Sequence, residues 1–311
     1  MRAIYRKTWT IVLAAAAAGL AWPGGALAWG PDGHEYIATV ARDRLAARDP
    51  KLGGRFYALL KGNILHYVGK DKRTGQPATC EARNLREIAS WADCVRYTTA
   101  YAGTAGYHFD DIGMCDDVAP APPPLPAYCA DGKCASEGLA HYIAILKDKK
   151  GSRRTRAEAL AWVIHIVGDL HQPLHNETNN DHGGNLVTIT LAPNAIPGRT
   201  FSAANLHALW DTPMVFASVG SGAAAVATIR ALADQHSADW AQNDVRTWVV
   251  EAHAIAKPAY HALPNAPACN AGAAAGGQIT SAYVDPFKDQ VREQLASAAI
   301  RLTDILADAL A

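Results

Sequence analysis

One segment constrains the fold more than any other, residues 155–175, with the sequence TRAEALAWVIHIVGDLHQPLH. From Leu160 to Leu170 it is apolar almost all round, which is typical of a helix buried on every side. The same helix places His165 and Asp169 four residues apart, on one face. An ionised carboxylate inside an apolar helix is costly unless it is paired or bound to a metal. The segment therefore predicts either a structural His–Asp hydrogen bond or a metal site.

The His–Asp spacing recurs in residues 205–211 (NLHALWD), on a second apolar segment. Further candidate ligands lie in three short motifs, WADCVR at 91–96, YHFDD at 107–111 and WGPDGH at 29–34, and just after the helix-ending Pro173. Each motif alone predicts little, because a lone His is usually a cap or a satisfied polar residue. Together they supply the nitrogen and oxygen ligands that zinc takes when cysteine is absent. The candidate ligands are His34, His108, His165, His175, His207, Asp93, Asp169 and Asp211.

The rest of the chain also indicates helices, and no linker separates two cores, so we expect one all-α domain with a minor β-hairpin. Residues 186–191 (LVTITL) alternate and form the convincing strand candidate, whereas the proline-rich 119–127 and the Gly/Ala-rich 270–277 are expected to be loops. The last helix should begin at Asp285-Pro286 and bury a stripe of apolar residues spaced by three and four. The expected helices are 34–47, 84–97, 137–148, 155–171, three between 203 and 260, and this last one.

The first 28 residues have the layout of a secretory signal peptide. Basic residues precede the apolar run Ile11–Leu20, and Ala26-Leu27-Ala28 is a small-residue cleavage site. The run is shorter than the roughly 20 residues needed to cross a bilayer, but an uncleaved membrane anchor is the alternative. Cleavage would leave 29–311 as the mature domain, beginning at Trp29. We therefore expect a secreted or periplasmic monomer without a transmembrane segment.

The charge of this mature domain is mildly acidic. The whole chain has 29 basic and 29 acidic residues, and removing the three basic residues of 1–28 leaves 26 against 29. Such a chain lacks the basic footprint of a protein that binds a phosphate backbone. If it handles nucleic acid, bound metal ions are the obvious source of positive charge.

The six cysteines predict disulfides, because their number is even and the chain is expected to be exported. Six cysteines allow 15 pairings, among which spacing alone does not choose. None forms a C-x-x-C pair, so a cysteine zinc site is not expected and metal binding must rest on His and Asp.

The order of the motifs carries a family resemblance. WGxxGH, WAD-x-x-R, HF-x-D, H-x-x-x-D-x-x-QPLH, GGN and NLH-x-x-WD, spread from Trp29 to Asp211, resemble the single-strand-specific zinc nucleases of fungi, plants and bacteria, the S-one/P-one nuclease family. The resemblance implies a domain of the phospholipase C/nuclease type. It also implies an endonuclease and 3′-nucleotidase that hydrolyses single-stranded DNA and RNA to 5′-nucleotides. The disulfides it implies are Cys129–Cys134 and Cys115–Cys269, and Cys80–Cys94 then follows by elimination.

The resemblance further implies three zinc ions, with Asp169 bridging the first and second. The first site would use Asp93, His108, His165 and Asp169. The second would use the free amine and carbonyl of Trp29, with His34 and Asp169. The third would use His175, His207 and Asp211.

Four other positions match residues with roles in substrate binding or catalysis. Arg96 and Asp111 match a catalytic pair, in which the arginine steadies phosphate charge and the aspartate orients the arginine. Phe109 and Asn185 match substrate-binding positions, and Phe109 would stack on a base. His171 and His182 match no ligand position and are expected to play supporting or structural roles.

Two other readings remain open. A zinc phospholipase C would share the fold, but its third site typically has a Glu where this chain has Asp211, and it lacks the base-stacking Phe. A non-catalytic zinc-scavenging protein would not need Arg96 and Asp111, because storage does not require an anion clamp.

Overall fold

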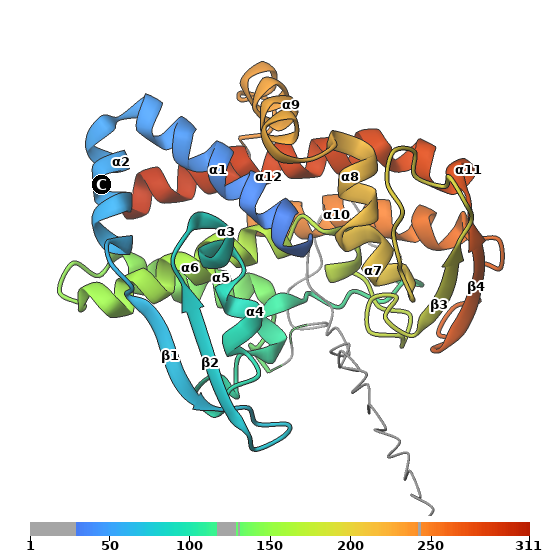
Figure 1. The fold of residues 1–311 in the computed structure, drawn as a ribbon, viewed down its shortest axis with the longest axis horizontal. Coiled ribbons are helices and arrows are strands. Elements are labelled where there is room, and N and C mark those ends of the chain that lie inside the picture. The colour runs from blue at the N-terminus through green and yellow to red at the C-terminus, as the bar shows by residue number, and fades with distance from the viewer. Residues whose placement is uncertain (1–28, 117–128, 130, 242–243) are drawn as a thin grey trace, which may run out of the picture.

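The computed structural model describes residues 29–116, 129, 131–241 and 244–311, and it is mostly helical (Figure 1). The expected signal peptide and proline-rich loop lie outside these residues. In chain order the elements are α1 Gly30–Arg48, α2 Pro50–Leu60, β1 Leu65–Lys70, β2 Pro77–Ala82, α3 Leu85–Ala89, α4 Trp91–Val95, the 3-10 turns η1 Thr99–Tyr101 and η2 Ala105–His108, α5 Ala135–Lys147, α6 Arg153–Asp169, η4 Pro173–His175, β3 Val187–Leu191, α7 Leu206–Asp211, α8 Pro213–Val219, α9 Gly222–Gln235, α10 Val245–His261, β4 Ala274–Ile279, α11 Ser281–Val284, η5 Asp285–Phe287 and α12 Lys288–Ala309.

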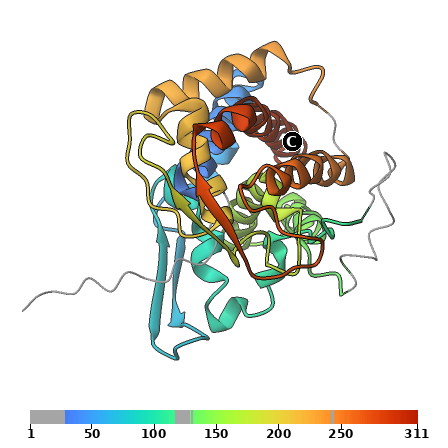
Figure 2. The ribbon, with the colours of Figure 1, turned by 90° about the vertical axis from the view of Figure 1, so that its right-hand side faces the viewer.

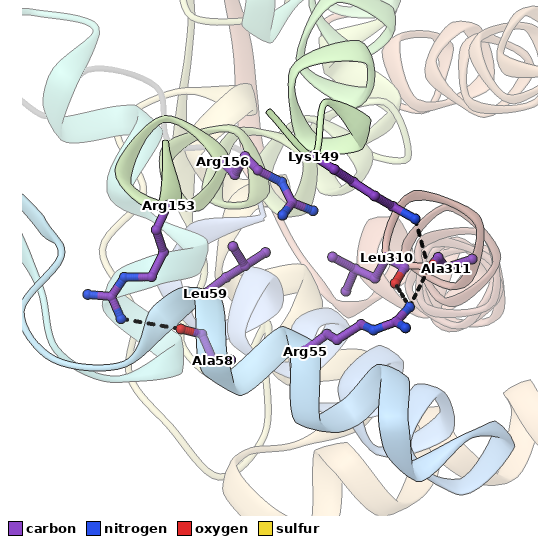
Figure 3. A pocket seen from close by; sticks show the side chains of 8 residues that line it. All are labelled: Arg55, Ala58, Leu59, Lys149, Arg153, Arg156, Leu310 and Ala311. Carbon is purple, nitrogen blue, oxygen red and sulfur yellow. Dashed lines mark hydrogen bonds between the residues drawn. The ribbon is translucent and has the colours of Figure 1, made fainter. Parts of the chain in front are cut away.

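Helix α6 is the centre of the fold, as its apolar sequence predicts. Ser152 caps its first turn by accepting a hydrogen bond from the Thr155 amide (3.1 Å). From Leu160 to Asp169 every side chain is buried, against α1, α2, α3, α4, α5 and α12. Each large aliphatic side chain buried here contributes about 1.5–3 kcal/mol. Its first residue, Arg153, lies at the surface and donates to the Ala58 carbonyl of α2 (Figure 3).

A second layer covers α6 on the side of α1 and α12, which run next to each other across the molecule (Figure 1). Helix α9 packs on both, and the view turned by 90° shows it as the outermost helix of this side (Figure 2). The predicted stripe of α12 is buried throughout and includes Val291, Leu295, Ala298, Ala299, Leu302 and Leu306. The helix begins three residues after the expected Asp285, because Asp285–Phe287 forms a 3-10 turn.

Two small sheets complete the described structure. A minor hairpin was expected, and strands β1 and β2 form one, antiparallel with Leu65 opposite Ala82, in a segment where no strand was predicted. Strand β3 confirms the predicted strand and pairs in parallel with β4. The expectation of a loop at 270–277 is wrong from Ala274 onward. The sequence AAGGQI has a single β-branched residue, Ile279, and two glycines, so it gives little signal of a strand. A Cβ at Gly276 would lie only 3.0 Å from Val187, so the small residue lets β4 pack closely against β3.

Several helix boundaries differ from expectation. The predicted helix 84–97 is interrupted at Ser90 and forms α3 and α4. Between 203 and 261 the described residues form four helices instead of three, because α7 ends at Asp211 and Pro213 begins α8. Helix α2 was not predicted, because two glycines and a proline weaken the helical pattern of PKLGGRFYALL.

The three disulfides implied by the resemblance are confirmed: Cys80–Cys94, Cys115–Cys269 and Cys129–Cys134. No single helix among the described residues is long and apolar enough to cross a membrane. Two consecutive helical segments, Leu206–Val219 and Gly222–Gln235, are long and apolar enough only when they are taken together. They are bent by 81° where they join.

Candidate metal centre

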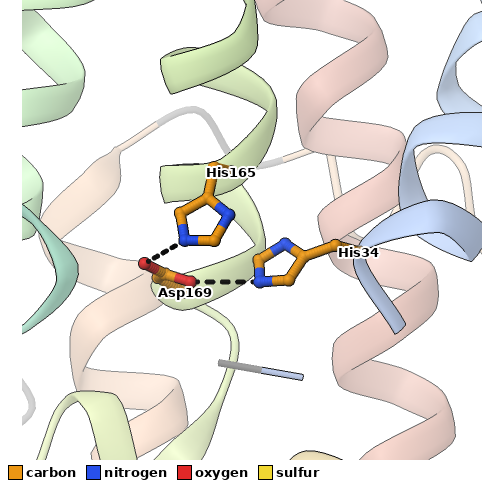
Figure 4. A group of neighbouring side chains, drawn as sticks. All are labelled: His34, His165 and Asp169. Carbon is orange, nitrogen blue, oxygen red and sulfur yellow. Dashed lines mark ion pairs between the residues drawn. The ribbon is translucent and has the colours of Figure 1, made fainter. Parts of the chain in front are cut away.

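Asp169 lies at the middle of the candidate site, at the buried end of α6. Its Oδ2 is 2.9 Å from His108 Nδ1 and 3.3 Å from His165 Nε2. Its other oxygen, Oδ1, is 3.3 Å from His34 Nε2 of α1, so the carboxylate faces two groups of ligands (Figure 4). All four side chains are buried. This arrangement is what a carboxylate bridging two metal ions requires.

The first group of ligand atoms joins α4, η2 and α6. Asp93 Oδ1 lies 3.6 Å from His165 Nε2 and 3.9 Å from His108 Nδ1. These three residues offer ligand atoms that all lie within 4.8 Å of one another. The structure therefore brings together the side chains expected at the first site, with Asp169 beside them.

The second group forms where α1 crosses α6. His34, His165 and Asp169 offer ligand atoms within 4.8 Å, and the His34 ring stacks on the His165 ring with centroids 4.2 Å apart. Trp29 is fully buried at the start of α1, and its carbonyl accepts a hydrogen bond from the Gly33 amide (3.0 Å). A carbonyl oxygen has two lone pairs, so one of them remains available to bind a metal ion.

The third group lies where η4 meets α7. His175 Nε2 is 3.0 Å from His207 Nε2, which is 3.6 Å from Asp211 Oδ2. The three residues are buried and their ligand atoms lie within 4.8 Å. The backbone carbonyl of His108, a residue of the first group, accepts a hydrogen bond from His175 Nδ1 of the third group (2.6 Å). The two His–Asp pairs of the sequence thus belong to neighbouring clusters.

Backbone carbonyls orient the histidines for metal binding. Nδ1 of His165 lies 2.7 Å from the Ala89 carbonyl, and Nδ1 of His207 lies 2.6 Å from the Gly183 carbonyl, the same arrangement as in His175. A carbonyl can only accept, so Nδ1 carries the proton and the Nε2 lone pair points into the cluster. Hydrogen bonding of the non-ligating nitrogen is characteristic of metal-bound histidine.

Several polar atoms at the site have no hydrogen-bond partner although they are buried: both ring nitrogens of His34, Nε2 of His108, and one oxygen each of Asp93 and Asp169. Leaving such atoms unsatisfied costs about 1–3 kcal/mol each. Metal coordination would satisfy most of them at once. The donor set of imidazole nitrogens and carboxylate oxygens therefore fits divalent metal ions such as zinc.

Burial keeps most of these histidines neutral, the form that binds metal. It lowers the pKa of His108 to about 4 with the help of the Arg96 charge, and it lowers the pKa of His207 to about 4. The pKa values of His34 and His175 are lowered for the same main reason. These rings are ready to coordinate at neutral pH without losing a proton.

His165 and Asp211 have pKa shifts opposite to those of a ligand. Burial lowers the pKa of His165, but the charges of Asp169 and Asp93 outweigh it and raise the value to about 9. Burial raises the pKa of Asp211 well above its usual range. A cation in each cluster would reverse both shifts, because positive charge favours the carboxylate and expels the imidazolium proton. Positive charge is therefore what this arrangement lacks.

Sequence reasoning missed residues that support the ligands. Gln172 Nε2 donates to Asp211 Oδ1 (2.8 Å) while its Oε1 accepts from the Leu174 amide. Gly168 lets His34 approach α6, since a Cβ there would lie 2.5 Å from His34 Nδ1. Gly183 allows a similar approach to the Leu174 carbonyl, 2.2 Å from where its Cβ would be. Gln172 and Gly183 had a sequence signal, their places in the QPLH and GGN motifs, whereas Gly168 had none.

Of the four expected substrate and catalytic residues, Arg96 and Phe109 contact residues of the clusters, whereas Asn185 and Asp111 have their neighbours in the 181–182 turn. Arg96 Nη2 is 3.5 Å from Asp93 Oδ1, and both side chains are nearly buried. Phe109 is half-buried, with its ring 4.8 Å from the His175 ring. Asn185 is half-buried and donates to the His182 carbonyl (2.7 Å). Burial raises the pKa of Asp111 to about 6, and His182 and Asp181 are the charged groups that act on it.

His171 and His182, which match no ligand position, have structural contacts. His171 is buried and its Nε2 accepts from Arg301 (2.9 Å), away from the clusters. His182 has a φ of 57° and forms the turn that precedes Gly183. Neither residue belongs to a group of candidate ligands among the described residues.

The fold and site together define a mostly helical protein with three neighbouring, buried clusters of His and Asp that can hold metal ions. A sequence model of the family described as S1/P1 Nuclease matches residues 29–311, and the chain belongs to this family. Membership supports nuclease activity on a nucleic-acid substrate.

Proteins of fungi and plants are similar to this chain. The chain is 31% identical to Nuclease S1 of Aspergillus oryzae over 64% of its own length and 58% of that protein. It is 27% identical to Nuclease P1 of Penicillium citrinum over 89% of its length and 96% of the relative. It is 24% identical to Endonuclease 2 of Arabidopsis thaliana, over 89% of both chains.

Proposed function

We propose that the protein is a zinc-dependent phosphodiesterase that hydrolyses single-stranded DNA and RNA to 5′-nucleotides and also acts as a 3′-nucleotidase. The observation that carries this proposal is the convergence of three buried His/Asp clusters whose Nε2 atoms are aimed by backbone carbonyls. Three zinc ions would occupy them, with Trp29, His34, Asp93, His108, His165, Asp169, His175, His207 and Asp211 as ligands.

Zinc supplies Lewis acidity that activates water near neutral pH and neutralises charge on phosphate. The residues of this chain prepare the site for that chemistry. Asp169 would hold two ions together, and Gln172 keeps the Asp211 carboxylate oriented. Three Zn²⁺ would also change the mature charge from −3 to about +3, concentrated at one place. That change would supply the positive charge missing from the protein surface.

Arg96, Asp111, Phe109 and Asn185 would handle the substrate. The Arg96 guanidinium lies beside the first cluster and would stabilise charge that develops on the phosphoryl oxygens. Asp111 would orient it. Phe109 lies against His175 with part of its ring exposed, so a base could stack there next to the third cluster. Asn185 would contribute a polar contact.

We also infer that residues 1–28 are removed on export, and that the protein works as a secreted or periplasmic monomer. Three disulfides support an oxidising compartment.

The test combines a metal count with a substrate comparison. Native mass spectrometry of the secreted protein should give about three zinc ions per chain. The same preparation should cleave single-stranded DNA and release phosphate from 3′-nucleotides while leaving phosphatidylcholine intact. Cleavage of phosphatidylcholine alone would favour the phospholipase reading. Three zinc ions without any hydrolysis would favour a scavenging protein.

A further inference from the structure

Arg96 stops short of an ion pair that its position favours. Its Nη2 atom lies 3.5 Å from Asp93 Oδ1, and both side chains are nearly buried. Opposite charges attract strongly where water is excluded, and an arginine–carboxylate pair normally closes to about 2.7–2.9 Å. Here the Asp93 oxygen remains without a hydrogen-bond partner. Another contact must therefore hold the guanidinium away from this candidate metal ligand.

The hydroxyl of Tyr97 provides such a contact. It accepts a hydrogen bond of 2.9 Å from the same Arg96 nitrogen, Nη2. The guanidinium carbon also lies 4.8 Å from the centre of the Tyr97 ring. A hydrogen bond from a charged donor is stronger than one between neutral groups. The hydroxyl therefore competes with Asp93 for Nη2, and the nitrogen lies closer to the hydroxyl.

The turn of the β1–β2 hairpin supports the Tyr97 ring. Arg73 of this turn places its guanidinium carbon 3.7 Å from the ring centre, a cation–π contact. Arg73 in turn donates two hydrogen bonds to Asp71, from Nη2 (2.6 Å) and Nε (3.2 Å). The Lys72 amide donates to the Tyr97 carbonyl (2.7 Å). Both the backbone and the ring of Tyr97 are thus held by the hairpin.

The same hairpin is attached to the chain just before Arg96. Cys80 of β2 forms its disulfide with Cys94 of α4, two residues before Arg96. The hairpin therefore holds the segment on both sides of Arg96, through the disulfide at Cys94 and through the stack at Tyr97. Neither attachment uses a candidate metal ligand, so Tyr97 can be altered without removing one.

We propose that Tyr97 is a positioning residue for Arg96. Supported by Arg73, its hydroxyl holds the guanidinium away from Asp93. The carboxylate then stays available to a metal ion, and the guanidinium stays available to a phosphoryl oxygen of the substrate. This inference rests on the proposed function and deepens it, because it assigns to the β1–β2 hairpin a part in preparing the site.

The first test removes only the hydroxyl. Tyr97→Phe keeps the ring, so the guanidinium should close on Asp93 and compete with the metal ion for that oxygen. We expect the zinc affinity, measured by competition with a chelator, to fall about 10-fold, as for a lost contact that supports a metal ligand. The kcat for cleavage of a short single strand should also fall about 10-fold, with KM within twofold, because Arg96 acts on charge that develops during the reaction.

Repeating the change in a protein without Arg96 separates positioning from a structural role. In the Arg96→Ala background, Tyr97→Phe should alter neither zinc affinity nor kcat, because no guanidinium remains to be held back. Tyr101→Phe is the matched control, since its hydroxyl lies four residues further along the chain and donates to Glu158 (3.0 Å). This control should leave both quantities within twofold of the wild type.

Arg73→Ala tests the support of the ring. It should lower kcat about 2–5-fold, the effect of losing a partly exposed cation–π contact. The same change should have no effect in Tyr97→Phe, in which the ring no longer carries the hydroxyl.

Two results would overturn the proposal. One is a Tyr97→Phe protein that binds zinc and turns over as Tyr101→Phe does. The other is an equal loss from Tyr97→Phe in the presence and absence of Arg96. The zinc measurement needs no turnover, so a wild type that binds zinc without cleaving nucleic acid would contradict the proposed function alone, and the zinc affinities would still decide the role of Tyr97.

Discussion

At the scale of single residues, Asp169 is the ligand on which most of the site depends. Its two oxygens face different histidines, Oδ1 toward His34 and Oδ2 toward His108 and His165. We expect Asp169→Asn to lose two metal ions and essentially all activity, because a neutral amide cannot bridge two cations. Asp211→Asn is the comparison and should lose only the third ion. Metal analysis of both purified variants decides this. A full metal content in Asp169→Asn would exclude the bridging role.

Gly168 offers a test that changes no ligand. An added methyl group would lie 2.5 Å from His34 Nδ1 and 2.6 Å from Cε1, so the ring must move away from Asp169. We expect Gly168→Ala to lower metal occupancy of the second cluster and turnover by about 10–100-fold. Gly54→Ala in α2 is the matched control, since nothing lies within 4 Å of its added Cβ. That control should gain up to about 1 kcal/mol of stability. Equal behaviour of the two variants would contradict the steric argument.

Arg96 and Asp111 can be tested as a pair. If Asp111 acts by orienting Arg96, the loss in kcat/KM for the double variant Arg96→Ala/Asp111→Asn should equal that of Arg96→Ala alone, because an absent side chain cannot be misoriented. Single-turnover cleavage of a short single strand supplies the rate constants, and zinc analysis confirms that the ligands are undisturbed. Losses that simply add would show that Asp111 has a separate role.

At the scale of elements, the start of α1 is the part whose role depends on processing. Trp29 is buried and a Cβ at Gly30 would lie 2.4 Å from Thr212 Oγ1, so the helix begins in a confined position next to Asp211. If the Trp29 amine is a metal ligand, a protein with one extra residue before it should hold one zinc fewer and lose about 100-fold in turnover, because an amide nitrogen is a poor ligand.

The control for this experiment removes the added residue and measures whether zinc content and activity return. A protease site ending immediately before Trp29 allows the same preparation to be measured before and after release of the extension. Activity and the missing zinc should return on cleavage. Full activity before cleavage would mean that Trp29 is only a packed aromatic residue.

The elements that carry the ligands were predictable from sequence, and the reason is local. A His and an Asp four residues apart in an apolar helix lie on one face whatever the helix packs against, so α6 and α7 could be recognised. Gly168 could not, because its proximity to His34 arises only when α1 crosses α6. Strand β4 escaped prediction for a similar reason: its small residues are suited to β3, which lies more than 80 residues earlier in the chain.

At the scale of the whole molecule, the disulfide Cys115–Cys269 joins distant parts of the chain. Its separation is 154 residues, against five for Cys129–Cys134. Loop-closure entropy predicts that the long bridge stabilises the protein by about 5 kcal/mol and the short one by about 2 kcal/mol. Urea unfolding of the Cys115→Ser/Cys269→Ser and Cys129→Ser/Cys134→Ser variants measures both. A smaller loss for the long bridge would point to residual structure in the unfolded chain.

The metal centre has a further consequence, because its candidate ligands come from α1, α4, α6 and α7, which lie far apart in the chain. Ions bound there would act as cross-links between these helices in the folded protein. Removal of the metal by a chelator should therefore lower the midpoint of thermal unfolding as well as abolish activity, and added zinc should restore both.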